Sequence, residues 1–508
     1  MPIRPALLAL FLASTAQAQT LEPLSVIDWL SNPPENLPGT VLLEPPVTQT
    51  GLQPDVQVTP LEALSPPLGL VSSSVTGLPV DLWQNSDPAR LAELIARVPV
   101  KASPAMQRLL FTLLLSEARP PADPTSPDAL LMARLERLMQ LGAADPAQSL
   151  VQLAGPTDTP DRFSRWFDAT LLTGDEDRSC TALIAQPHLS RDYAAQIFCK
   201  ARRGDWPSAA LTLEAAHALQ VLPQDQLDLL DRFLSPELFE DADYLPQPAN
   251  PTPLTFRLFE AIGERLPTAS LPRAFANADL RDVAGWKAQI EAAERLTRIG
   301  ALTPNQLLGL YTERKPAASG AVWDRVAAIQ RFDTALRPGN SDGVADTLPE
   351  AWTQMRSIGL EVPFAELFAQ RLQSVPLSDT RAENLRWRIL LLSDLYEDAA
   401  LTAPEGPDKN QFLTALAQGD PGRAPSPSPL ADAIAEGFAW SAPVPPDIHA
   451  LLQNNHLGEA ILEAMTLFAH GARGNLVDLT AAIATFRRVG LEDTARRAAL
   501  QLMILNGA

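Results

Sequence analysis

The chain has 508 residues, of which 46% are hydrophobic and 20% charged, so it exceeds the length of one ordinary core and has the balance of a soluble protein. Its 60 acidic and 40 basic residues give a net charge of −20 at pH 7. Such a surface repels phosphate backbones and anionic lipid heads, which argues against binding to nucleic acid or to a membrane surface.

The first 19 residues, MPIRPALLALFLASTAQAQ, have the pattern of a bacterial signal peptide. Arg4 supplies the positive charge, Ala6–Ala13 the apolar core, and Ala16-Gln17-Ala18 a small-x-small cleavage site. The apolar core is far shorter than the ~20 residues that span a bilayer, so it is not an anchor. We expect residues 1–18 to be removed by cleavage near Ala18, and the mature chain to be periplasmic without a transmembrane segment.

Residues 19–85 are rich in proline and show almost no helical periodicity. Two small apolar islands, LSVIDWLS and LPVDLW, interrupt this segment. The composition predicts an extended, Pro-rich tether, either flexible or docked on the rest of the chain through Trp29 or Trp83.

Residues 86–400 carry apolar side chains at steps of three and four, as in RLLFTLLLSEA, DALLMARLERLMQLG and LRWRILLLSDLYEDAA. No alternating strand pattern of comparable length occurs, and proline or glycine stands at most breaks. This pattern predicts an all-α body of helical hairpins, an α-solenoid in which each repeat buries its faces against its neighbours.

The two cysteines lie in EDRSCTALIAQPHLSRDYAAQIFCKARRGD, which predicts one helix over residues 175–186, a turn, and a second helix over residues 191–202. Antiparallel helices would bring Cys180 and Cys199 to nearly the same height. In an oxidising compartment this spacing favours a disulfide between them, contributing about 3 kcal/mol. The alternative is a pair of buried thiols that pack as small hydrophobic residues.

After Gly204 the chain places Ala209, Leu213 and Ala216 at offsets of five, nine and twelve, a small-large-small series. The same offsets after Gly142 and Gly490 give Ala147, Val151, Ala154 and Ala495, Ala499, Leu502. Small residues let two helices approach closely, and the apolar residues fill the groove between them. These segments resemble the second helix of a tetratricopeptide (TPR) repeat, which implies a degenerate TPR-like array. The first-helix pattern of that family is matched only by Tyr193.

The loop TERKPAASGAVWDRV is the most polar interruption of the body. It contains Arg314 and Trp323 together with several charged residues. Arginine and tryptophan carry much of the binding energy of protein interfaces. We predict these two residues as the partner-binding patch. The simpler alternative is that Ser319 and Gly320 only cap and turn the chain.

Residues 401–446, with DPGRAPSPSPLADA and SAPVPPD, predict a Pro-rich hinge before a C-terminal helical unit over residues 447–508. His449, His456 and His470 lie close together in the sequence there. They lack the three or four convergent ligands of a metal site, so we expect no metal, cofactor or catalytic residue.

The predicted function is a non-enzymatic periplasmic scaffold that binds a protein or peptide in the cell envelope. The layout of signal peptide, helical body and Pro-rich segments is similar to that of some periplasmic accessory proteins of the bacterial flagellar motor. The alternative is a peptidoglycan-related envelope enzyme with an unrecognised site. The segment RLMQLG resembles a motif of lytic transglycosylases, although it is more simply the core face of a helix. That family also needs a Glu-Ser pair upstream, whereas Glu117 precedes Ala118.

Overall fold

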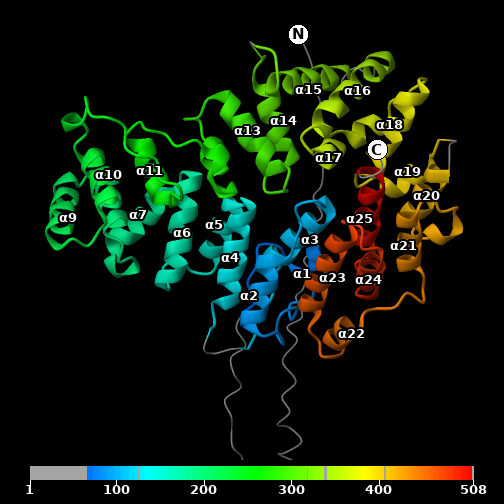
Figure 1. The fold of residues 1–508 in the computed structure, drawn as a ribbon, viewed down its shortest axis with the longest axis horizontal. Coiled ribbons are helices and arrows are strands. Elements are labelled where there is room, and N and C mark those ends of the chain that lie inside the picture. Colours follow the sequence, from blue (N-terminus) through cyan, green and yellow to red (C-terminus); the bar gives the residue numbers. More distant parts are fainter. Residues whose placement is uncertain (1–65, 123–125, 317, 337–339, 405–407, 506–508) are drawn as a thin grey trace, which may run out of the picture. The chain divides into compact units, whose positions relative to one another are not determined.

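The computed structural model describes residues 66–122, 126–316, 318–336, 340–404 and 408–505 (Figure 1). All of them belong to one unit of the chain, which runs from Leu64 to Ala508. Within these residues the secondary structure is helical, with no strand and only two isolated β-bridges, Leu68 with Ala118 and Val71 with Ser116. The all-α prediction is therefore confirmed. Trp29 and the signal peptide lie outside the described residues.

The first half of the unit contains the following helices: α1 (Ser73–Thr76), α2 (Pro88–Arg97), α3 (Pro104–Leu115), α4 (Ala129–Leu141), α5 (Ala144–Leu153), α6 (Pro160–Thr173), α7 (Glu176–Ala185), α8 (Tyr193–Arg202), α9 (Trp206–Leu219), α10 (Gln224–Leu234), α11 (Pro253–Ala261) and α12 (Ala276–Asp279). The second half contains α13 (Trp286–Thr297), α14 (Pro304–Glu313), α15 (Val322–Leu336), α16 (Ser341–Arg356), α17 (Glu361–Gln373), α18 (Thr380–Leu391), α19 (Tyr396–Leu401), α20 (Asp408–Ala417), α21 (Pro429–Phe438), α22 (Pro446–Gln453), α23 (Leu457–Gly471), α24 (Leu476–Arg488) and α25 (Glu492–Leu505). Short 3-10 turns lie between them: η1 (Pro187–Leu189), η2 (Pro236–Leu238), η3 (Thr268–Ser270), η4 (Arg273–Phe275) and η5 (Pro421–Arg423).

Helices that follow one another in the sequence pack side by side through most of the unit, as α4 to α10 and α13 to α20 do. The small-large-small series lies in the resulting grooves: Ala209, Leu213 and Ala216 are all buried. Gly204, which precedes them, has φ +82°, a left-handed conformation that a side chain would strain. The unit is thus an array of helical hairpins, with glycines such as Gly204 at its turns.

Many of the prolines begin helices rather than interrupt them. Within the described ranges, seven α-helices start at proline: α2, α3, α6, α11, α14, α21 and α22. In six of these the preceding Ser, Thr or Asp accepts a hydrogen bond from a backbone N–H of the first turn. Proline suits this position because its missing N–H would have no helical partner and its φ is already helical.

The disulfide joins α7 to α8. Cys180 and Cys199 are both fully buried, with their Cα atoms 4.9 Å apart and a sulfur–sulfur bond of 1.97 Å. The turn η1 reverses the chain between the two helices, which places the cysteines at the same height. The predicted pairing is confirmed, and the described residues contain no free cysteine.

The described end of the predicted tether, residues 66–85, packs on the helices. Leu78, Leu82 and Trp83 are buried, and the guanidinium of Arg134 in α4 donates hydrogen bonds to the carbonyls of Leu68, Leu114 and Ser116. Arg134 itself is buried, which lowers its pKa to about 10. Its donors therefore fix the entry of the chain into the array.

Residues 401–446, predicted as a hinge, contain two helices of ordinary length, α20 and α21. The segment LRWRILLLSDLYEDAA forms the end of α18 and the start of α19. Ser393 ends the first of these, because its hydroxyl accepts a hydrogen bond from the backbone N–H of Leu395.

The last helices of the unit pack against the first, so the array closes on itself. In Figure 1 the blue helices α2 and α3 lie beside the red helices α23 to α25, and the contacts pair α3 with α25 and α2 with α23. The backbone N–H of Ala105 donates to Oε1 of Gln501 at 2.8 Å, and Arg90 pairs with Glu463 at 2.7 Å. Closure brings residues from both ends of the unit to one place.

Candidate functional site

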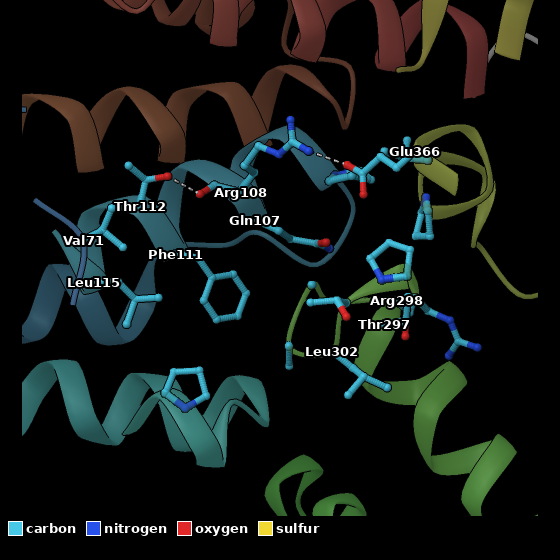
Figure 2. A pocket seen from close by; sticks show the side chains of 18 of the residues that line it. Val71, Gln107, Arg108, Phe111, Thr112, Leu115, Thr297, Arg298, Leu302 and Glu366 are labelled. Atoms are coloured by element: carbon cyan, nitrogen blue, oxygen red, sulfur yellow. Dashed lines mark hydrogen bonds and ion pairs between the residues drawn. The ribbon is translucent and has the colours of Figure 1, made fainter. Parts of the chain in front are cut away.

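A cavity of about 580 Å³ lies where α3 faces the α13–α14 turn and the start of α17 (Figure 2). Residues 71–76 form a further part of its wall. Apolar side chains dominate the lining: Val71, Val75, Phe111, Leu115, Leu302 and Val362. Four prolines, Pro104, Pro146, Pro304 and Pro363, complete the apolar wall. Its size is within the ~300–1,000 Å³ that is usual for ligand sites.

One face of α3 supplies a whole wall of this cavity. Gln107, Arg108, Phe111 and Leu115 follow one another at steps of one, three and four residues and therefore share a face of the helix. The opposite face carries buried leucines of the core, among them Leu109 and Leu113. Phe111 and Leu115 are only partly buried, and Figure 2 shows the Phe111 ring projecting from α3 toward the side of Thr297 and Leu302.

The facing wall is the turn between α13 and α14. Gly300 has φ +81°, and a Cβ atom built on it would lie 3.4 Å from the Phe111 ring. Thr303 begins α14 with a capping box, in which its hydroxyl and the side chain of Gln306 each satisfy a backbone donor. These two features hold the turn close to Phe111 and fix the width of the cavity.

An ion-pair network borders the cavity on the side of α17. Arg108 pairs with Glu366 at 2.6 Å and with Asp394 at 3.1 Å, and Asp394 also pairs with Arg497 at 2.7 Å. Burial raises the pKa of Glu366, and Arg108 opposes that rise. For Asp394, burial alone would raise the pKa, but the hydrogen bonds and positive charges of Arg108 and Arg497 outweigh it and lower the pKa. Arg108 is therefore already satisfied by carboxylates.

Three other arginines near the cavity bond to backbone carbonyls instead. Arg298, in the cavity wall, donates to the carbonyl of Ile358, and Arg295 donates to those of Thr268 and Leu271. Arg273 donates to the carbonyl of Gln140 at 3.3 Å. Within the described ranges none of the three arginines has a carboxylate at ion-pair distance. Burial lowers the pKa of Arg273 and of Arg295, and neighbouring arginines lower each of them further.

The arginine trio, Arg273, Arg295 and Arg298, therefore gives this part of an acidic chain a local positive charge. Thr297 adds an unsatisfied polar group to the cavity wall: its hydroxyl is buried and finds no hydrogen-bond partner among the described residues. Leaving such a group unpaired costs ~1–3 kcal/mol. The arrangement suits a ligand with an apolar body and a negative charge at its edge.

The structure places Arg314 and Trp323 elsewhere. Arg314 is exposed and pairs with its neighbour Glu313 at 2.8 Å. Trp323 is partly buried, with its ring centre 5.0 Å from that of Trp286, so it is not the freely exposed aromatic that the loop suggested. Neither residue lines the cavity, and their role in binding a partner stays a prediction.

The three C-terminal histidines have separate neighbours. His456 lies 2.8 Å from Glu459, His470 lies 3.1 Å from Asp478, and His449 contacts Gln453. In the part of the chain that the structure describes, no group of three or more His, Cys, Asp or Glu side chains has an arrangement that would hold a metal ion. Over the same residues, no helix combines the length and the apolar character needed to cross a bilayer.

No protein-family model matches this chain, and neither the curated proteins nor the solved structures compared with it include a significant match.

Proposed function

We propose that this protein is a non-enzymatic helical scaffold of the bacterial periplasm that holds an apolar segment of a partner protein in the cavity beside Phe111. The N-terminal signal-peptide pattern and the disulfide support the compartment, because disulfides persist in oxidising spaces. The TPR-like series supports a role in holding protein segments. A place in flagellar-motor or envelope assembly fits the same layout.

The observation that carries the proposal is the apolar wall built from three distant parts of the unit. Val75 is exposed, Phe111 is partly buried and Leu302 is buried, and all three line one cavity. Burying a leucine- or phenylalanine-sized side chain of the partner there contributes ~1.5–3 kcal/mol. Two such side chains supply much of the affinity of a micromolar complex, which needs about 8 kcal/mol.

The arginine trio indicates what lies next to those apolar residues in the partner. An arginine that meets a carboxylate forms a bidentate, charge-assisted pair. Because like charges repel, the trio also disfavours basic partner segments, which the acidic remainder of the chain would attract. We therefore propose a partner segment with apolar residues followed or preceded by Asp or Glu.

A photo-cross-linker tests this proposal at one wall residue and one matched control. Benzoylphenylalanine replaces Val75, which is 76% exposed at the cavity, or Val477, which is 79% exposed on α24 outside it. In cells that make the protein, position 75 should give one discrete cross-linked product, mapping to an apolar segment of one protein. The intact mass of the protein from the same periplasmic material should correspond to a chain that begins at Gln19.

The charge reversal Arg298→Glu should then lower the yield of this product about tenfold, since a true interface anchor is worth ~1.4 kcal/mol or more. Arg314→Glu serves as the matched control and should leave the yield unchanged. Equal products from positions 75 and 477 would contradict the cavity as the site. A loss with Arg314→Glu alone would move the site to the loop around Trp323.

A further inference from the structure

A second cavity, of about 590 Å³, lies at the C-terminal ends of α21 and α24. Its lining comes from the end of α21, the loop of residues 439–445, the first turn of α22 and the last turn of α24. It shares no residue with the cavity beside Phe111. The two sites are therefore independent.

The most unusual residue of this second cavity is Trp440, whose side chain is 98% exposed. Other tryptophans of the described unit, such as Trp83 and Trp387, are fully buried. Burial of an indole is strongly favourable, so an indole left in water is a feature of binding surfaces more than of folding. Trp440 offers a flat aromatic face with nothing stacked on it.

The fold holds the backbone on both sides of Trp440. On one side, α21 packs very closely on α24, because a Cβ atom on Gly437 would lie 2.8 Å from Cβ of Ile483. The Thr480 hydroxyl reinforces the contact by donating to the carbonyl of Ala433 at 3.0 Å. On the other side, the N–H of Ala442 donates to the carbonyl of Ala439 at 3.1 Å, which closes a turn around Trp440. Prolines at 443, 445 and 446 then stiffen the loop.

Two arginines lie at the last turn of α24 below this loop. Arg487 stacks over the ring of Phe438 at 5.2 Å and donates to the Phe438 carbonyl, so its position is fixed. Arg488 is exposed, and none of the described residues forms a hydrogen bond or ion pair with its guanidinium. Arg488 therefore has all of its donors available for a ligand, next to an unstacked indole.

Two further polar side chains line the cavity, the carboxylate of Glu492 and the imidazole of His449. Glu492 is at the edge, where it pairs with Arg496 and lies 3.8 Å from Arg487. His449 is exposed on α22, with its Nε2 atom 3.0 Å from the Gln453 amide. The cavity thus combines donors, an acceptor, one positive charge without a partner, and one aromatic face.

We propose that this second cavity binds an acidic sugar, a pyranose ring that carries a carboxylate. The C–H face of the ring packs on the indole of Trp440, and the carboxylate pairs with Arg488 in the fork geometry that guanidinium favours. The hydroxyls of a sugar both donate and accept, which matches Glu492 together with His449. A purely apolar peptide would leave Arg488 and Glu492 unused. A long polyanion would be repelled by the chain, whose net charge is −20.

Calorimetry with three probes on the full-length chain tests the ligand class. Trigalacturonic acid carries rings and carboxylates, maltotriose carries rings alone, and hexaglutamate carries carboxylates alone. Trigalacturonic acid should bind at least about tenfold more tightly than either of the other two. Equal binding of maltotriose, tighter binding of hexaglutamate, or no binding of trigalacturonic acid at millimolar concentration would overturn the proposal.

Two variants and two matched controls test the residues. Trp440→Ala and Arg488→Ala should each weaken the binding of trigalacturonic acid about tenfold or more. Tyr244→Ala removes another aromatic side chain that is 84% exposed, and Arg473→Ala removes another exposed arginine, so neither should change the binding. All four side chains lie at the surface, and unchanged circular dichroism checks that the variants fold. Equal losses of binding in the variants and in their controls would show that the binding does not depend on the second cavity.

Discussion

The hairpins of residues 174–220 and the segment of residues 401–446 are both helical, yet the second region has many more prolines between its helices. In the first region, Gly174 and Gly204 take left-handed conformations, with φ +95° and +82°, and each is followed by an acidic residue that begins the next helix. In the second region Gly419 is also left-handed, with φ +84°, and is followed by Asp420, but prolines at 421, 425 and 427 then precede the next α-helix. Pro429 is the first residue of α21, capped by the hydroxyl of Ser428.

The difference shows that proline content reports where a helix begins as much as where the chain is extended. A proline disfavours helix at the residues before it and not at those after it, because its ring clashes with the preceding turn. Pro425 and Pro427 keep the chain extended up to Ser428, and from Pro429 onward the helix forms. In residues 401–446 the position of each proline, more than the number of prolines, decides where a helix forms.

The largest effect should come from removing the disulfide of the first region. The double change Cys180→Ser and Cys199→Ser should lower the free energy of unfolding by about 3 kcal/mol, because the bridge restricts the unfolded chain. Urea unfolding followed by circular dichroism measures this loss. A reducing agent should destabilise the parent chain and leave the double variant unchanged. If both proteins unfold at the same urea concentration, the first region does not depend on its cross-link.

An intermediate effect should follow from adding one methyl group to the second region. Gly437→Ala places a Cβ atom against Ile483, and overpacking of this kind costs ~1–3 kcal/mol. Gly309→Ala, in α14, is the matched control: a Cβ atom there meets nothing within 4 Å, so the change should be neutral or slightly stabilising. Equal melting temperatures for the two variants would show that α21 and α24 are less tightly packed than the structure indicates.

The smallest effect should be common to both regions. Asp205→Ala removes the cap of α9, and Ser428→Ala removes the cap of α21. Each change leaves a backbone donor unsatisfied and should cost ~1 kcal/mol in urea unfolding. Similar losses would show that the two regions use the same kind of helix start. A loss confined to Asp205→Ala would mean that Pro429 alone is sufficient to begin α21.

Much of the fold could be predicted from the sequence because its signals are local. Apolar residues spaced three and four positions apart coincide closely with α4, α13 and α15. The positions of Cys180 and Cys199 on either side of a proline turn are enough to predict the disulfide between them. The closure of α3 on α25 was missed, because no local pattern encodes which distant helix covers an apolar face. The TPR-like identification stays a prediction.

The candidate sites were missed for the same physical reason. In RLLFTLLLSEA the residues Phe111 and Leu115 look like the core leucines around them, and only the positions of Gly300 and Val362 leave space beside them. Trp83 and Trp440 both occur in Pro-rich stretches with small apolar islands, yet one is buried and the other fully exposed. Periodicity tells which face of a helix is apolar, whereas a cavity is decided by what packs against that face.

The contact between the two ends of the unit has a consequence for how the protein is made. In an open array each repeat contacts only its neighbours, so folding can spread from any repeat and need not wait for the last. Here Ala105 and Gln501 bond across 396 residues of sequence, and the helices α2 and α3 cannot acquire their final neighbours until the ribosome has released α25. Until then the apolar surface of the first helices stays uncovered, and contacts of such long sequence separation form slowly.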